Sequence, residues 1–148
     1  MANDYTKIAL QLQKYGTVQG LMKYINKESL IEQDEKQEKG KAVGIDRVTK
    51  EEYDENLEEN IDDLIERMKR FAYRPKSTRR VYIPKEGSTK QRPISIPAYE
   101  DKLVQGVMAE ILEQIYEPIF LNTSYGFRPG KSCHDAIDRL DKIIMKQK

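Results

Sequence analysis

Five cations gather in a short stretch near the middle of this 148-residue chain, where a single acidic residue opposes them. Arg79 and Arg80 begin the stretch, and Lys85, Lys90 and Arg92 follow. Lysine and arginine bring positive charge and N–H donors to one place, and phosphate oxygens bind both. Clustering of this kind is the electrostatic footprint of a polyanion-binding site.

The charge of the chain is divided between two neighbouring segments. Residues 26–66 hold 15 acidic and 6 basic residues, a net charge of −9, whereas residues 67–92 hold 10 basic and 1 acidic, a net charge of +9. The formal net charge of +1 hides this division. Two interpretations stay open on charge alone: the basic segment binds a polyanion, or it neutralises the acidic helix that precedes it.

The residues that must position these cations predict two short strands. Val81 and Ile83 alternate with larger polar neighbours, a period of two that favours a strand with one half-buried face. Pro84 ends this strand, a second strand covers residues 94–96 between two further prolines, and Gly87 lies in the turn. Because proline cannot donate to a ladder, both strands are expected at an edge. The segment therefore predicts a stiff, basic β-hairpin.

A long amphipathic helix is predicted over residues 49–71, directly before the hairpin. Thr49 and Glu52 have the spacing of a capping box at its start. Its basic end suits the helix dipole and delivers positive charge to the hairpin. Apolar residues recur mostly in steps of three or four, which predicts one buried stripe: Tyr53, Leu57, Ile61, Leu64, Ile65, Met68 and Phe71.

Two more helices are predicted after the hairpin. Residues 100–115 carry a broad apolar stripe that is typical of a core-facing helix. Ser132 and Asp135 open a last helix with four apolar residues at helical spacing. The glycine- and proline-rich segment between the two is expected to be a structured loop, because Tyr125 and Phe127 are poor residues to leave in water.

The N-terminal part predicts helices with fewer core contacts. Residues 4–24 indicate one or two short helices, broken near Gly16, with Thr17 as a candidate cap for the second. Residues 29–39 alternate charges of both signs, which favours an exposed helix. The glycine-bounded turn at residues 40–44 is expected to be mobile.

These elements predict an α+β fold, with helices packed on a small antiparallel sheet and a projecting basic hairpin. We expect residues 1–45 to form an N-terminal helical extension with a mobile acidic, glycine-bounded segment, and residues 46–148 to form the main unit.

Composition excludes several classes of site. No apolar run approaches the ~20 residues of a membrane-spanning helix, so a cytoplasmic location is expected. One cysteine, Cys133, and one histidine, His134, leave no disulfide and no zinc site, and capping or packing is expected of both. The pair Asp62–Asp63 lies mid-helix among other carboxylates, so it predicts a solvated face and not a metal site.

Several separate segments resemble, in order and spacing, the N-terminal part of group II intron-encoded reverse transcriptases, which also act as maturases. They cover roughly residues 40–137 and read KAVGIDRVTKEEY, YRPKSTRRVYIPKEGSTKQRPISIP, DKLVQ and EPIFLNTSYGFRPGKSCHDAI. Arg47 stands where the family usually has a glycine, which leaves the geometry of that turn open. Other bacterial reverse transcriptases share looser versions of these motifs. The resemblance implies the fingers of a right-hand polymerase and the beginning of its palm.

The resemblance also implies roles for the hairpin. In this family the hairpin folds over the incoming nucleotide, which would put Lys85 and Arg92 on its triphosphate, with Arg79 as a further contact. A lysine is a compact point charge and an arginine can bind phosphate oxygens bidentately, so the two would neutralise charge as pyrophosphate leaves. Ile94 and Ile96 resemble residues that pack beneath the templating base, and plain hairpin core is an equal interpretation for both.

The remaining candidate contacts are to nucleic acid. Arg80 and Lys90 belong to the same basic hairpin. The turn that holds Lys41 resembles a loop that rests on the template–primer duplex. Arg128 is expected to support the junction of fingers and palm or to contact the template.

Catalysis needs residues that this sequence does not contain. Right-hand polymerases place two Mg²⁺ ions between palm carboxylates, some of them in a Tyr-X-Asp-Asp turn, and no such motif occurs here. We therefore expect a fragment with no catalytic residue and no metal ligand, inactive alone, and Mg²⁺ as the cofactor of a full-length RNA-directed DNA polymerase.

The expected partners are an RNA template, intron RNA, a DNA primer and a deoxynucleoside triphosphate, without a membrane. A homodimer through exposed fingers surface is a further expectation. Three alternatives remain: an RNA-binding maturase segment with no catalytic role, another class of bacterial reverse transcriptase, and a self-associating protein whose charged halves pair between subunits.

Overall fold

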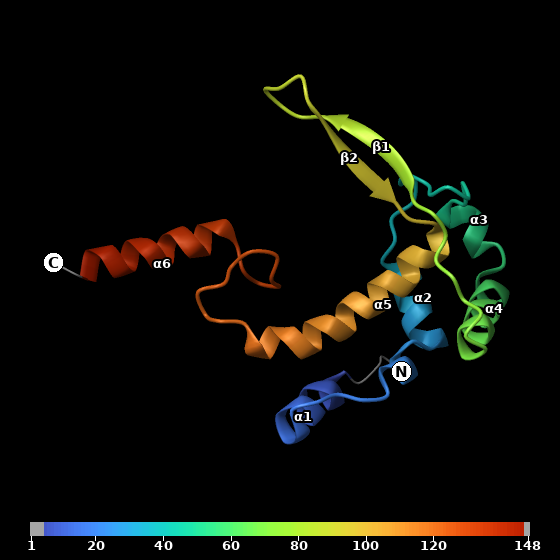
Figure 1. The fold of residues 1–148 in the computed structure, drawn as a ribbon, viewed down its shortest axis with the longest axis horizontal. Coiled ribbons are helices and arrows are strands. Elements are labelled where there is room, and N and C mark those ends of the chain that lie inside the picture. Colours follow the sequence, from blue (N-terminus) through green and yellow to red (C-terminus); the bar gives the residue numbers. More distant parts are fainter. Residues whose placement is uncertain (1–4, 147–148) are drawn as a thin grey trace.

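The computed structural model describes residues 5–146 and shows a body of helices from which one two-stranded hairpin projects (Figure 1). The expectation that helices pack on the sheet was wrong, because the buried core of the described residues takes side chains from helices only. The described residues form six α-helices, two short 3₁₀ helices (η1 and η2) and one antiparallel pair of strands, which confirms the α+β class. In chain order the elements are α1 (Thr6–Tyr15), η1 (Leu21–Tyr24), α2 (Lys27–Glu35), α3 (Lys50–Asp54), α4 (Leu57–Lys69), β1 (Arg79–Pro84), β2 (Gln91–Ile96), α5 (Tyr99–Tyr116), η2 (Glu117–Ile119) and α6 (Cys133–Lys146).

One hydrophobic core holds the helices together, and α5 contributes the largest share of it. Removing these side chains from water is the main favourable term for the assembly. The boundary expected after residue 45 does not divide this core, which takes side chains from both sides of it. The buried core residues are Ile8, Tyr24, Leu30, Tyr53, Ile61, Leu64, Tyr99, Leu103, Val104, Val107 and Ile111.

The break near Gly16 is confirmed, but Thr17 does not cap a second helix. Gly16 follows α1 in the left-handed conformation, with φ of 67°, and its N–H donates to Leu12. Glycine suits this position because it has no Cβ to clash. The next element is the 3₁₀ helix η1, which Gly20 precedes without any side-chain cap.

The prediction of an exposed helix at residues 29–39 was wrong. Helix α2 starts at Lys27 behind a capping box formed by Asn26 and Ser29, and it buries Leu30 completely. Two polar residues that favoured exposure, Gln33 and Asp34, are also buried. Each has a distant polar partner, so burial leaves neither unsatisfied.

The single helix predicted over residues 49–71 is two helices. The capping box of Thr49 and Glu52 is confirmed, but α3 ends at Asp54 and α4 starts at Leu57. The side chain of Asn60 donates to the carbonyl of Tyr53 at 3.0 Å and so joins the two helices. Phe71 was wrongly assigned to the buried stripe, because it lies beyond α4 and is 86% exposed.

The hairpin β1–β2 projects from the helical body, as predicted (Figure 1). Its ladder includes Pro84, opposite Gln91 at the turn end, and Pro93, opposite Tyr82 within the pairing. The sheet has only these two strands, so both are edge strands, as predicted. The prediction that Val81 and Ile83 form one half-buried face was only partly correct. Val81 is half-buried, whereas Ile83 is 48% exposed, because the outer part of the hairpin has no helix beneath it.

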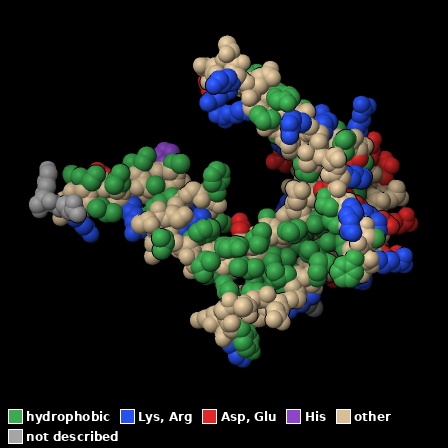
Figure 2. All heavy atoms as spheres, in the orientation of Figure 1, with side chains coloured by type: hydrophobic (Ala, Val, Ile, Leu, Met, Phe, Trp, Pro, Cys, Tyr) green, Lys and Arg blue, Asp and Glu red, His purple; other side chains and the backbone are tan. Residues whose placement is uncertain are grey.

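Helix α6 extends away from the core, and its apolar side chains are exposed (Figures 1 and 2). Ser132 and Asp135 form the expected capping box at its start. The expectation that Phe127 avoids water was wrong: its side chain is fully exposed, while Tyr125 is half-buried. Among the described residues, no helix is long and apolar enough to cross a membrane.

Candidate phosphate-binding hairpin

The register of the hairpin places the candidate residues on one face. Arg79 pairs with Ile96, Val81 with Ile94, and Ile83 with Arg92. Residues directly opposite each other in an antiparallel ladder share a face, and residues two apart along a strand share that face too. The intervening pairs, which include Arg80 with Ser95 and Tyr82 with Pro93, face the other way.

The turn of the hairpin extends this face by one more pair. The N–H of Lys85 donates to the carbonyl of Lys90 at 3.0 Å, and the N–H of Ser88 donates back to the carbonyl of Lys85 at 3.1 Å. Gly87 takes a left-handed φ of 70°, which glycine adopts without steric cost. The turn is therefore folded, and it sets Lys85 opposite Lys90.

Lys85 and Arg92 line the same hollow near the tip of the hairpin. It has a volume of about 610 Å³, and the other side chains that line it are Ile83, Pro84, Glu86 and Ile94. All of them are exposed to solvent, Ile94 by 42%. The hollow therefore combines two cations with an apolar wall, and a ligand with phosphates and a flat apolar part matches both.

The cations of the hairpin have no ion-pair partner within the described residues. No carboxylate lies within ion-pair distance of Arg80, Lys85, Lys90 or Arg92, and Lys85 faces Lys90 across the turn. Like charges directly opposite each other destabilise a hairpin. An anion bound between them would relieve this repulsion. Figure 2 shows the Lys and Arg side chains along the projecting hairpin.

Three of the basic residues before the hairpin behave differently. Arg67 binds Asp63 at 2.7 Å and also Glu100, and the hydrogen bond with Glu100 is the main cause that raises the pKa of Arg67. Arg70 pairs with Glu66, and Lys76 pairs with Asp46 at 3.2 Å. Neutralisation of the acidic segment therefore explains these cations, but it does not explain those of the hairpin.

Arg79 is committed to a contact inside the protein. Its Nε donates to the carbonyl of Val43 at 2.8 Å, and Lys102 donates to the carbonyl of Ala42 at 2.9 Å. Gly44 lies so close to the start of α5 that an added Cβ would be 2.4 Å from the carbonyl oxygen of Pro97. These contacts fasten the turn at residues 40–44 to the root of the hairpin.

The two remaining candidate cations also have partners. Lys41 pairs with Glu38 at 2.6 Å, and this hydrogen bond raises the pKa of Lys41 although both side chains are exposed. Arg128 binds Glu117 at 2.7 Å and donates to the carbonyls of Leu121 and Ser124, with its side chain 7% exposed. Arg128 therefore organises its own loop, and a contact of either residue with nucleic acid stays a prediction.

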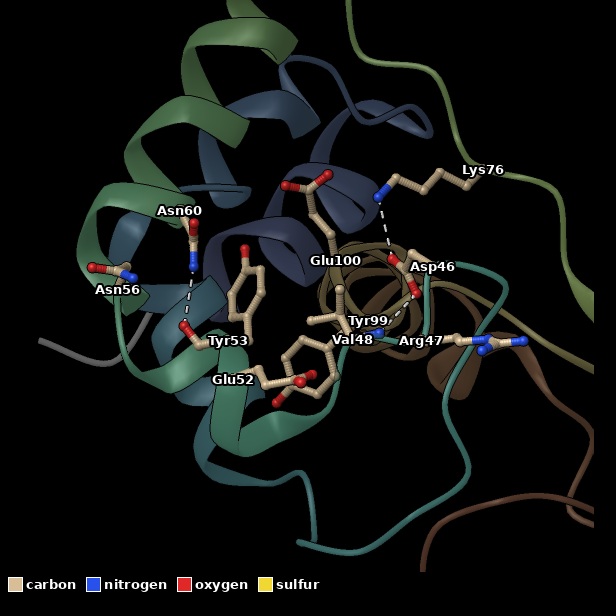
Figure 3. Close-up of a pocket in the computed structure, with 10 residues that line it drawn as sticks. All are labelled: Asp46, Arg47, Val48, Glu52, Tyr53, Asn56, Asn60, Lys76, Tyr99 and Glu100. Atoms are coloured by element: carbon tan, nitrogen blue, oxygen red, sulfur yellow. Dashed lines mark hydrogen bonds and ion pairs between the residues drawn. The ribbon is translucent and has the colours of Figure 1, made fainter.

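A second hollow, which the sequence did not indicate, lies between α3, α4 and the start of α5 (Figure 3). It has a volume of about 560 Å³. The rings of Tyr53 and Tyr99 pack at 4.9 Å on its inner side, and Asp46 accepts from Lys76 at its rim. Arg47, also at the rim, has a left-handed φ of 60°. An arginine gives no sequence signal for a left-handed conformation, so sequence reasoning did not predict the conformation of Arg47.

Known proteins resemble parts of this chain. A family model described as reverse transcriptase (RNA-dependent DNA polymerase) matches residues 83–148. The group II intron-encoded protein LtrA of Lactococcus lactis subsp. cremoris is 46% identical over 85 residues, 57% of this chain and 14% of that protein. Protein YkfC of Escherichia coli (strain K12) is 42% identical over 94 residues, 64% of this chain and 24% of that protein. The mitochondrial nuclear intron maturase 2 of Arabidopsis thaliana is 44% identical over 39 residues, 26% of this chain and 5% of that protein.

Over part of its length the chain is similar to group II intron-encoded proteins and to the reverse transcriptase model. The match to the reverse transcriptase model includes Lys85 and Arg92, whereas Arg79 lies before it. Because the chain spans only 14% of LtrA, the comparison concerns a part of such a protein.

The conformation of Arg47 agrees with the resemblance noted in the sequence, which places a glycine at this position. A left-handed φ is what glycine adopts most readily, so the arginine bears the steric cost of this turn.

The described residues of this chain provide no set of ligands for a metal ion. Among residues 5–146, no three His, Cys, Asp or Glu side chains are grouped so that they could hold a metal ion. The residues present therefore do not fit the Mg²⁺ pair of a polymerase, and no catalytic step is assigned to them.

Proposed function

We propose that this chain is the fingers region of an RNA-directed DNA polymerase, and that its hairpin holds the triphosphate of the incoming nucleotide. The observation that carries the proposal is the shared hollow of Lys85 and Arg92, cations that have no carboxylate partner. The relatives named as intron-encoded proteins support the class of enzyme.

The two cations have complementary tasks. The guanidinium of Arg92 can donate two parallel N–H bonds to one phosphate group, which fixes its orientation. The ammonium of Lys85 is a mobile point charge that can follow the leaving pyrophosphate. Together they stabilise negative charge as it develops, which is the protein's main contribution to phosphoryl transfer. Ile94 then supplies an apolar surface for the templating base.

Other candidate residues act around this centre. Arg79 fixes the turn at residues 40–44 against the hairpin root, so we assign it a positioning role. Arg80 and Lys90 extend the positive surface for the template–primer backbone, and Ile96 sits at the hairpin root, where its side chain is half-buried. Residues 46–148 form the fingers and the start of the palm in this proposal, with residues 1–45 as an extension.

The chain alone should not polymerise DNA. The Mg²⁺ ions of the reaction belong to carboxylates that this sequence does not provide, because it has no Tyr-X-Asp-Asp motif. Mg²⁺-dependent primer extension by the purified chain would contradict this assignment.

Intron RNA binding is the second candidate function. The name of the Arabidopsis relative, nuclear intron maturase 2, favours it. Under this alternative the hairpin cations bind RNA phosphates, and nucleotide affinity does not depend on them.

Exposed apolar side chains of α5 and α6, such as Leu112 and Ile144, also support a homodimer of the isolated chain.

A salt titration tests the proposal. Binding of a fluorescent RNA template–DNA primer duplex is measured by anisotropy from low to high salt, for the chain and for Lys85→Ala, Arg92→Ala and Lys14→Ala. We expect salt-dependent binding of the duplex that Lys85→Ala and Arg92→Ala leave nearly unchanged, because their cations are assigned to the nucleotide. Lys14→Ala, on α1, is the control. Weaker binding by both hairpin variants, with the salt slope lowered by about 0.7–0.9 for each lost phosphate contact, would contradict the proposal and favour the RNA-binding alternative.

A further inference from the structure

A groove far from the hairpin face lies between η1 and the C-terminal end of α4. It has a volume of about 490 Å³, and its wall is mainly apolar. The apolar lining residues are Met22, Ile25, Ile65, Met68, Phe71 and Tyr73. We call it the η1–α4 groove. In Figure 1, α4 lies at the opposite side of α5 from α6, so this groove is separate from the exposed face of α6.

Phe71 is held at the rim of the groove at two local costs. It is 86% exposed, and its φ of 56° is left-handed, a conformation that side chains with a Cβ rarely adopt. The N–H of Ala72 donates to Arg67 at 2.8 Å and the N–H of Phe71 donates to Met68 at 3.0 Å, the two bonds of a Schellman motif. Glycine is the usual residue at the position of Phe71 in that motif.

Phenylalanine at position 71 therefore gives the folded state no stability that glycine would not give, and glycine would avoid the backbone strain. Strain and apolar exposure at one residue are typical of a site kept for binding. Methionine side chains beside it adapt their shape to different apolar groups, and they are common at surfaces that bind peptides.

The charge around the groove has one sign. Lys23, Lys69 and Arg74 line it, and none of them has a carboxylate within ion-pair distance among the described residues. The nearby carboxylates of α4 have other partners, since Asp62 binds Lys27 and Glu66 binds Arg70. The rim is therefore positive although the segment before Arg67 is strongly acidic.

We propose that the η1–α4 groove docks an acidic amphipathic helix of a partner protein. Its apolar side chains would pack against Met22, Met68 and Phe71, and its carboxylates would face Lys69 and Arg74. This is the helix-in-groove mode of peptide recognition, with anchors three or four residues apart. A nucleic acid fits less well, because bases stack on aromatic faces. The groove is mainly aliphatic, and Tyr73 is fixed by its bond to Asp101.

The probe for this test is a synthetic helical peptide with leucines at positions i, i+3, i+4 and i+7 and glutamates on its flanks. Chain labelled with ¹³C at its methionine methyl groups is titrated with it and observed by NMR. Met22 and Met68 should shift, whereas Met108 and Met145, on the exposed faces of α5 and α6, should not. A peptide with lysines in place of the glutamates should bind about tenfold or more weakly.

Phe71→Gly separates binding from folding. Glycine fits the left-handed position, so the variant should unfold at a higher temperature, while its affinity for the acidic peptide should fall about tenfold or more. Lys69→Glu should weaken binding similarly, and Lys14→Glu should not. Unchanged peptide affinity in Phe71→Gly would overturn the proposal. So would shifts of Met108 and Met145 in place of Met22 and Met68, or equal shifts of Met22 and Met68 with a single-stranded RNA of matched length.

Discussion

Arg92 lies directly opposite Ile83 in the hairpin ladder, and Lys85 follows Ile83 by two residues. This relationship puts a guanidinium, an ammonium and an isoleucine side chain on one face of a projecting element. It is the geometric basis of the proposed nucleotide contact. The same register turns Arg80 to the opposite face, so two cations of one hairpin have different tasks.

Asp34→Ala should destabilise the protein strongly. Asp34 accepts from Lys50 at 2.6 Å and from Tyr99 at 2.7 Å, and the side chains of Asp34 and Lys50 are 4% and 11% exposed. The variant leaves Lys50 with the Asp34 carbonyl and with Asp54 at 3.4 Å, and it leaves the buried Tyr99 hydroxyl without its acceptor. Breaking a buried ion pair costs about 3–5 kcal/mol of unfolding free energy. Urea denaturation measures it.

The control for Asp34→Ala is Asp62→Ala. Asp62 is 60% exposed and binds Lys27, and exposed pairs contribute about 0–1 kcal/mol. A similar loss of stability in both variants would show that the buried ion pair contributes no more to the unfolding free energy than the exposed one.

Gly44→Ala should disturb the root of the hairpin. The added Cβ would lie 2.4 Å from the carbonyl oxygen of Pro97 and 2.6 Å from the Cα of Ala98. The backbone must move, at a cost of about 1–3 kcal/mol. Thermal unfolding of Gly44→Ala and of Gly126→Ala measures the difference, since a Cβ at Gly126 meets nothing within 4 Å. Equal midpoints would contradict the close approach.

Arg47→Gly should stabilise the protein. The left-handed conformation costs a residue with a Cβ about 1–2 kcal/mol, and glycine loses about 0.5–1 kcal/mol in backbone entropy on folding. The net expectation is a gain of about 0.5–1 kcal/mol in unfolding free energy. Chemical denaturation of the two proteins tests it, and a less stable variant would mean that the Arg47 side chain makes a contact worth more than the strain.

Acid should release the loop that Arg128 organises. The hydrogen bond from Arg128 lowers the pKa of Glu117 below its usual value of 4.5. A carboxyl with a lowered folded-state pKa stabilises the fold above its unfolded-state pKa, and this contribution is lost as pH falls through the folded-state pKa. The chemical shift of the Arg128 Nε–H should therefore stay constant at neutral pH and move toward that of a solvent-exposed guanidinium as Glu117 becomes protonated, below the usual carboxyl pKa.

Glu117→Gln should remove this acid-dependent change in chemical shift, because the amide does not ionise. Glu113→Gln, one helical turn before it, should leave the acid transition in place. An identical pH profile in Glu117→Gln would show that another group holds Arg128.

The hairpin could be predicted because its signals are local. Alternation from Val81 to Ile83, the flanking prolines and the glycine turn all lie within residues 79–97, and β1 matches them. The second strand was predicted too short, at residues 94–96, because β2 begins at Gln91 and includes Pro93. The same alternation, continued along both strands, would have placed Arg92 and Lys85 on one face of the hairpin. That inference needs the pairing register of the two strands, which the length of the turn fixes.

The buried side of α2 could not be predicted in this way. Asp34 looks like a solvated residue in an acidic run, and its partners Lys50 and Tyr99 lie 16 and 65 residues further along the chain. Periodicity reports apolar faces, so a buried polar network stays hidden until the tertiary structure brings its members together. The prediction that Phe71 is buried was wrong for the opposite reason, because the apolar periodicity of the sequence continues past the residue where α4 ends.

The most direct test of the account is the response of the hairpin to nucleotides. The methyl signals of Ile83 and Ile94 are followed by NMR while a deoxynucleoside triphosphate, its diphosphate or the nucleoside is added at millimolar concentration. We predict shifts that decrease as phosphates are removed, that vanish in Lys85→Ala and Arg92→Ala, and that survive in Arg80→Ala. Equal shifts with the nucleoside, or shifts that persist without both cations, would contradict the assignment of the triphosphate to this face.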